Sequence, residues 1–211
     1  MNNIITISRQ HGSGGREIGA ILAKKLHLPF YDKELITRAA KESGFAEAAF
    51  ENAEKKATNS LLYSIAMGMN AYGNHDIGIA HLSIDDQIYL AQSDVIRKIA
   101  SEGPCILVGR CADYILKDHD QVVNVFIWAD MKFRRKRIAA LYQMEESKAE
   151  DEIIKADKRR ANYYNYRATE KWGRAENYHM SLRSDYIGME NTAECIARYL
   201  QYGERGLSSR E

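Results

Sequence analysis

Short runs of apolar residues alternate along the chain with longer stretches in which apolar positions recur at helical spacing. Three runs, at 4–7, 104–108 and 122–128, are almost continuous, a pattern typical of parallel strands that are buried on both faces. Two shorter runs, at 29–31 and 178–182, are further strand candidates. Strands that alternate with helices favour an α/β fold. The pattern therefore predicts a five-stranded parallel sheet sandwiched by helices.

The stretches between these runs have the spacing and the caps of helices. Apolar residues recur at helical spacing over 18–26, and again near 193–200. Residues with capping side chains begin four other helical stretches: Asp32, Ser83, Asp130 and Ser147. We expect a single domain over residues 1–203, which includes a helical insertion at 45–82, followed by a loose tail at 204–211.

A glycine-rich segment joins the first predicted strand to the first predicted helix. Three of the four residues 12–15 are glycine. Glycines let backbone N–H groups turn toward one point, and the first turn of a helix adds unpaired N–H donors and the positive end of its dipole. The segment therefore predicts a site for the donor phosphates, formed by Gly12, Ser13, Gly14, Gly15 and Arg16. A tight turn that binds no ligand is the alternative.

This segment departs from the P-loop pattern G-x-x-x-x-G-K-[ST]. If Gly14 is the second glycine of the pattern, Arg9 replaces the first glycine, Gly15 the lysine and Arg16 the hydroxyl residue. A shift by one residue places Arg16 at the lysine position and Glu17 at the hydroxyl position. Because the lysine is missing in both registers, Arg16 and Arg9 are the candidate sources of its charge.

Composition and charge limit the classes of protein to which the chain can belong. It has 211 residues, a formal net charge of +1 and three cysteines, none of them in a C-x-x-C pair. Residues 130–174 carry 13 Lys or Arg against 8 Asp or Glu, a local basic excess that a solvated helix face also explains. No signal-peptide pattern or apolar run of about 18 residues appears. We expect a cytoplasmic protein that binds neither nucleic acid nor membranes, and a homodimer stays open.

Several segments together resemble the nucleoside monophosphate kinases. They are the glycine segment, residues 31–38, residues 109–110, the pair Arg134 and Arg137, and the pair Arg159 and Arg160. The resemblance is closest to the divergent cytidylate kinase-like family, whose glycine segment reads S-R-Q-x-G-S-G-G-R-E-I and which shares the motifs Y-D-K-E-L-I and D-K-x-R-x-x-Y-Y. It covers nearly the whole chain. The resemblance implies a P-loop kinase fold with an acceptor-binding insertion at 45–82 and a LID segment at 145–175.

The resemblance also implies roles for individual residues. Asp32, Arg38 and Arg110 would bind the acceptor monophosphate. Arg134 and Arg137 would lie on the donor nucleotide side.

The LID segment would contribute arginines that close over the transferring phosphoryl group. Arg159 and Arg160, together with Arg16, are the candidate catalytic residues. Consecutive helix residues point about 100° apart, so we expect one of the pair to face the phosphates. Asp157 lies three residues before Arg160 and can pair with it, which slightly favours Arg159, whereas the D-K-x-R motif marks Arg160.

We expect ATP-dependent phosphoryl transfer to a nucleoside monophosphate, CMP-like, or to a related small acceptor. Mg2+ would enter with ATP, held by nucleotide oxygens and water, with Ser13 or Glu17 within reach. Val108 and Cys111 stand where cytidylate kinases have acidic residues, so recognition of cytosine stays open.

Two functions of other classes stay open as well. A nucleotide-binding regulator without catalysis would account for the missing lysine. A dinucleotide-binding oxidoreductase would account for residues 12–14 as the start of a G-x-G-x-x-G segment, with Asp32 near the ribose-binding spacing, although Glu17 occupies the place of the third glycine.

Overall fold

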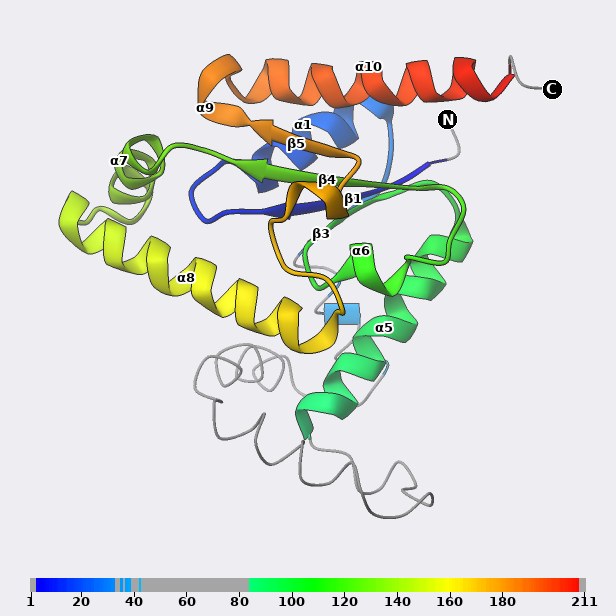
Figure 1. Cartoon of the computed structure of the whole chain (residues 1–211), viewed down its shortest axis with the longest axis horizontal. Coiled ribbons are helices and arrows are strands. Elements are labelled where there is room, and N and C mark those ends of the chain that lie inside the picture. Colours follow the sequence, from blue (N-terminus) through cyan, green and yellow to red (C-terminus); the bar gives the residue numbers. More distant parts are fainter. Residues whose placement is uncertain (1–2, 33–34, 36, 39–41, 43–83, 209–211) are drawn as a thin grey trace.

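The computed structural model describes residues 3–32, 35, 37–38, 42 and 84–208. Within this part of the chain, five strands form one sheet in the order β2-β3-β1-β4-β5, and every pair of neighbours is parallel. The strands are β1 (Ile4–Arg9), β2 (Phe30–Tyr31), β3 (Ile106–Val108), β4 (Val122–Trp128) and β5 (Met180–Arg183). The predicted five-stranded parallel sheet is confirmed (Figure 1).

Helices lie on both sides of the sheet (Figure 1). They are α1 (Gly15–Leu26), α5 (Ile84–Glu102), α6 (Ala112–Ile115), α7 (Met131–Tyr142), α8 (Glu146–Arg167), α9 (Ser184–Ile187) and α10 (Met189–Ser208), with a 3-10 turn at Ala175–Asn177. α1 packs against α10, and α7 packs against α8. None of the helices in the described residues combines the length and the apolar composition that a membrane span needs.

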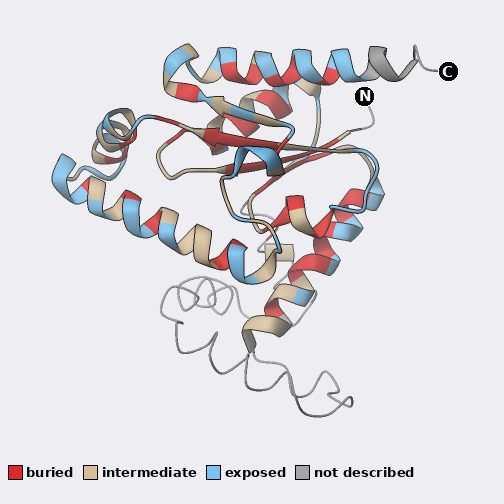
Figure 2. Cartoon of the chain, in the orientation of Figure 1, coloured by how far each residue is buried: buried red, intermediate tan, exposed pale blue. Residues whose placement is uncertain are grey.

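The apolar residues of β1 alternate between two buried clusters. Ile5 and Ile7 pack with Ile18 of α1 and Ile196 of α10. Ile4 belongs to the opposite cluster, with residues of α5, α6 and α8. Successive side chains of a strand point to opposite faces, so covering both faces with helices buries residues 4–8 of the strand (Figure 2). This arrangement explains why the first apolar run is continuous rather than alternating.

The sheet positions the candidate site because the carboxyl ends of parallel strands share one edge. Residues 10–14 follow β1 at this edge, residues 109–111 follow β3, and Asp32 follows β2. α8 reaches the same edge, since the Arg160 guanidinium donates a hydrogen bond to the Arg9 carbonyl oxygen (3.0 Å).

Some element boundaries differ from the prediction. α10 continues to Ser208, so residues 204–208 are helical and the predicted loose tail is wrong for them. A single glycine such as Gly203 costs a helix only about 1 kcal/mol, and no proline follows it. The predicted insertion at 45–82 lies outside the described residues, and the extent of the single domain stays a prediction.

The helix caps agree in part with the sequence. Asp130 caps α7 as predicted, because its carboxylate accepts a hydrogen bond from the Lys132 N–H (2.8 Å). α8 begins one residue before Ser147, at Glu146, and has no side-chain cap.

One acid is buried within the core. Asp113 of α6 is 4% exposed, and its Oδ2 has no hydrogen-bond partner among the described residues. The pKa of its carboxyl is raised from 3.8 to about 6, chiefly by burial; the Tyr164 hydroxyl opposes this shift, and the nearby Glu170 carboxylate adds to it. A raised pKa means that the folded state holds the proton more tightly than the unfolded state. The contribution of the protonated Asp113 carboxyl to the free energy of unfolding is therefore fully present below pH 3.8, and it is lost as pH rises through 6.

We therefore expect Asp113→Asn to stabilise the protein relative to wild type by an amount that grows between pH 4 and pH 7, up to about 3 kcal/mol. Thermal melts across this pH range measure the difference. Asp118→Asn, at an exposed acid beyond α6, is the control and should show no such trend. A difference between Asp113→Asn and wild type that stays constant with pH would contradict the assignment.

Candidate active site

The glycine loop, residues 10–14, wraps around the start of α1. Gly12 and Gly14 both have a φ of 80°, in the left-handed region that favours glycine. Gly14 is the N-cap of α1, and no side chain caps the helix. The first N–H groups of α1 therefore have no intrahelical partner and can bind an anion.

Ser13 fixes the glycine loop through hydrogen bonds on its buried side. This residue is fully buried, and its hydroxyl donates to the Gln10 carbonyl oxygen (2.9 Å). The Ser184 hydroxyl in turn donates to the Ser13 carbonyl oxygen (2.6 Å). Ser13 thus fixes the shape of the loop from inside the protein.

A cleft of about 310 Å³ surrounds the glycine loop. It is lined by four arginines, one acid, the loop and an apolar and aromatic side: Arg9, Gln10, His11, Gly12, Gly14, Gly15, Arg16, Glu17, Arg137, Ile138, Leu141, Tyr142 and Arg160. The volume is at the lower end of the range for small-molecule sites. The structure therefore brings most of the predicted donor phosphate residues together in a cationic cleft.

A smaller cavity of about 40 Å³ lies beside this cleft, where β3 ends. Its lining is Ser8, Arg9, Gly109, Arg110, Cys111, Arg160, Tyr163, Tyr164 and Trp172. Arg110 and Cys111 both have a positive φ (57° and 55°), a conformation that non-glycine residues adopt mainly at functional or strained positions. Arg9 and Arg160 line both cavities, so the two spaces lie next to each other at these two residues.

Asp32 lies between two arginines. Its carboxylate forms an ion pair with the Arg16 Nε (2.7 Å) and a longer one with the Arg9 Nη2 (3.8 Å). Arg38, the other predicted acceptor residue from this region, pairs with Glu102 (3.3 Å) and lies over the Tyr31 ring. Asp32 thus contacts residues of the cleft, whereas Arg38 is in neither lining.

Arg134 and Arg137 lie one helical turn apart on α7 but in different surroundings. Arg137 lines the cleft and pairs with Glu17 (2.7 Å). Arg134 is buried, and its Nη1 contacts Asp157 Oδ2 (2.5 Å) and the His11 carbonyl oxygen (3.4 Å). Its location supports a structural role in place of the predicted contact with the donor nucleotide.

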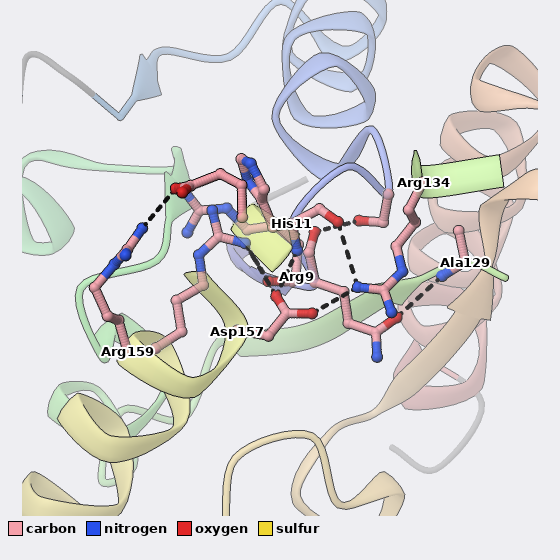
Figure 3. Close-up of polar contacts among 10 residues, drawn as sticks. Arg9, His11, Ala129, Arg134, Asp157 and Arg159 are labelled. Carbon is pink, nitrogen blue, oxygen red and sulfur yellow. Dashed lines mark hydrogen bonds and ion pairs between the residues drawn. The ribbon is translucent and has the colours of Figure 1, made fainter. Parts of the chain in front are cut away.

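Asp157 connects α8 to both the loop and α7. Its Oδ1 accepts a hydrogen bond from the His11 N–H (2.7 Å), and its Oδ2 meets Arg134 (Figure 3). Arg160 lies 3.8 Å from the same carboxylate. A single carboxylate therefore joins three segments that are far apart in the sequence.

The two LID arginines point to different partners. The Arg159 Nη2 donates to Glu152 on its own helix (3.1 Å), whereas Arg160 reaches the Arg9 carbonyl oxygen and both cavities (Figure 3). The slight preference for Arg159 from spacing is thus not supported. The expected pair with Asp157 does form, but Asp157 itself lies at the loop and holds Arg160 there.

Comparison with known proteins gives the family. The model of the cytidylate kinase-like family matches residues 4–186. The chain belongs to the cytidylate kinase-like family. An uncharacterized protein from Eubacterium ventriosum is similar in structure, with a TM-score of 0.70 and 25% identity over 95% of this chain and 99% of that chain. Shikimate kinase from Bacteroides thetaiotaomicron has a TM-score of 0.53 and 13% identity over 95% and 99% of the two chains.

The likeness to shikimate kinase shows that this family member has the P-loop kinase fold. A search of curated proteins finds no match. The assignment of individual residues therefore depends on the geometry of the site.

Few of the described side chains lie where they could bind the predicted Mg2+. The Ser13 hydroxyl is buried and bonded to Gln10, so its predicted contact with the metal is not supported. Glu17 lines the cleft, where it is paired with Arg137. The described residues contain no group of three or more His, Cys, Asp or Glu that could hold a metal.

Among the cleft residues that were not predicted site residues are His11, Leu141 and Tyr142. Burial and then the charge of Arg160 lower the pKa of His11 from 6.5 to about 4, so its imidazole is neutral at pH 7 and stacks against Tyr142 (6.3 Å between ring centroids). Leu141 and Tyr142 are more than half exposed. Nothing in the local sequence marks these residues, because their importance comes from the position of the end of α7 beside the loop.

Proposed function

We propose that this protein transfers a phosphoryl group from ATP to a nucleoside monophosphate, CMP-like, or to a related small acceptor. The observation that carries the proposal is that two cavities at the carboxyl edge of the sheet share Arg9 and Arg160. Phosphoryl transfer requires a donor and an acceptor in line, with positive charge at the equatorial oxygens of the transferring group. Two arginines that line both cavities can supply that charge, and the kinase-like family supports this class of reaction.

Each part of the site has a task in this reaction. The N–H groups of the glycine loop and of the first turn of α1 bind the donor phosphates. The exposed side chains of Leu141 and Tyr142, beside the neutral His11 ring, offer an apolar surface for the donor base. Arg110 binds the acceptor phosphate at the second cavity, and Arg160 from α8 contacts the transferring group. Mg2+ supplies further positive charge when it enters with ATP.

The oxidoreductase alternative conflicts with the sheet. In the dinucleotide-binding order 3-2-1-4-5, the second strand is the neighbour of the first. Here β3 lies between β2 and β1. The strands of the described residues therefore do not have the order that this alternative requires.

A thermal-shift panel combined with a turnover assay tests the proposal. A nucleotide at 100 times its Kd should stabilise the protein by about 2.7 kcal/mol, so ATP with Mg2+ and the correct monophosphate should each raise Tm. ADP formation that depends on the monophosphate would then establish the enzyme. Binding of ATP without turnover for any acceptor would instead support the regulator, and no shift with any nucleotide would refute both.

Arg110→Ala should weaken the acceptor monophosphate by about 10- to 100-fold, because a hydrogen bond to a charged group contributes roughly 1.5 to 3 kcal/mol. The affinity for ATP should change little. Isothermal titration with each nucleotide separates the two effects. Arg97→Ala, at an exposed arginine of α5, is the matched control, and equal weakening of donor and acceptor by Arg110→Ala would show that the second cavity is not an acceptor site.

A further inference from the structure

Two departures from the P-loop pattern occur at positions that are six residues apart in the sequence. With Gly14 as the second glycine, Arg9 stands at the first glycine position and Gly15 at the lysine position. Considered separately, each change removes a feature of a phosphate site. The structure shows that the two residues are in direct contact.

The stem of the Arg9 side chain lies across Gly15. A Cβ atom on Gly15 would be 2.6 Å from the Arg9 Cβ and 2.9 Å from its Cγ, far closer than two carbons can approach. Gly15 is not among the described glycines with a positive φ, so its backbone would accept any residue. Position 15 therefore excludes a side chain mainly because Arg9 occupies the space.

Arg9 lies where a phosphate-binding cation is needed. It lines the cleft of the glycine loop and also the cavity at Arg110, and its side chain is 20% exposed. Both candidate arginines pair with Asp32, but Arg16 is 60% exposed, is bonded to it at 2.7 Å and lines only the cleft, whereas Arg9 lines both cavities and its pair with Asp32 is longer, at 3.8 Å. Arg9 is thus the better placed of the two (Figure 3 shows its position beside His11 and Asp157).

We propose that Arg9 supplies the positive charge that a lysine provides in the usual P-loop, and that Gly15 is the matching change that makes room for it. The two departures are then one exchange, in which the cation moves from the start of α1 to the end of β1. Its ligand is the transferring phosphoryl group of the nucleotide, so this inference rests on the proposed function. A guanidinium also differs from an ammonium in presenting a planar fork of donors to two phosphate oxygens.

Stability measurements test the contact without any assay of activity. Gly15→Ala should lower Tm by roughly 5 °C, because overpacking costs a few kcal/mol, and Arg9→Gly in the same chain should remove most of that loss. Gly19→Ala, also in α1, would meet Phe30, Ile7 and Val108 instead, so Arg9→Gly should not rescue it. Equal effects of Arg9→Gly on both alanine variants would overturn the proposed exchange.

Kinetic measurements test whether the reaction needs the positive charge of Arg9. Arg9→Met keeps the aliphatic stem over Gly15 and removes the charge, so kcat/KM should fall by about 100-fold with Tm nearly unchanged. The double variant R9G/G15K restores the first glycine and the lysine of the pattern, with Arg16 still at the hydroxyl position, and should be at least tenfold more active than R9G. Wild-type activity in Arg9→Met, or a double variant no better than R9G, would overturn the inference. Absence of turnover in the wild-type protein would instead refute the proposed function, and the stability cycle would still test the packing.

Discussion

Arg160→Ala is expected to lower kcat by about 10³-fold, the effect of removing an arginine that acts on a transferring phosphoryl group. Arg160 lines both cavities and is held at the loop by the Arg9 carbonyl oxygen and Asp157. In the proposed reaction, charge placed between the two cavities would stabilise the transition state more than the bound ground state. The Kd for ATP, measured without acceptor, should therefore change little while kcat falls in steady-state assays.

Arg159→Ala is the matched control for this result. Arg159 is the preceding residue on α8, but its guanidinium bonds Glu152 and it lines neither cavity. Its replacement should leave kcat within about threefold of wild type, since exposed ion pairs contribute at most about 1 kcal/mol. If Arg160→Ala keeps the wild-type kcat, the LID assignment fails, and the basic excess over 130–174 is better interpreted as a solvated face.

Local patterns in the sequence are sufficient for much of the fold. The continuous apolar runs identify β1 and β4 because both faces of these strands are covered. The order of the strands is a different matter, since pairing β1 with both β3 and β4 depends on contacts between residues about 100 positions apart. Local periodicity contains no information on such pairings, so the sequence predicted a parallel sheet but not its order.

The site shows the same limit at the level of single residues. Gly12 and Gly14 were predictable because only a few residue types accept a left-handed φ. Arg134 and Arg137 look alike in the sequence, yet one is buried against Asp157 and the other lines the cleft. The difference depends on where α8 packs against α7, which the spacing of charges does not specify.

That buried contact leads to the largest expected effect on stability. Arg134→Met removes the positive partner of Asp157 and leaves a mostly buried carboxylate without its closest cation. Breaking one side of a buried ion pair typically costs about 3 to 5 kcal/mol. The free energy of unfolding, measured with urea, should fall by that amount.

Two further variants establish the cause of this loss. Arg135→Met, at the next residue of α7, breaks more exposed pairs with Glu146 and Glu150 and should cost less than about 1 kcal/mol. The double variant R134M/D157N has no buried charge left to compensate and should recover much of the stability that R134M loses. If R134M lowers the free energy of unfolding no more than R135M does, the Arg134–Asp157 pair does not stabilise the fold as a buried ion pair.

The same pair links stability to the site, because Asp157 also accepts the His11 N–H and so fixes the glycine loop. D157N keeps an oxygen that can accept this hydrogen bond but removes the charge beside Arg134 and Arg160. R134M/D157N should therefore regain stability and still bind ATP, whereas Asp157→Ala, which removes the acceptor, should weaken ATP by about tenfold in titrations. Equal ATP affinity in the Asn and Ala variants would show that the loop holds its shape without the hydrogen bond from His11.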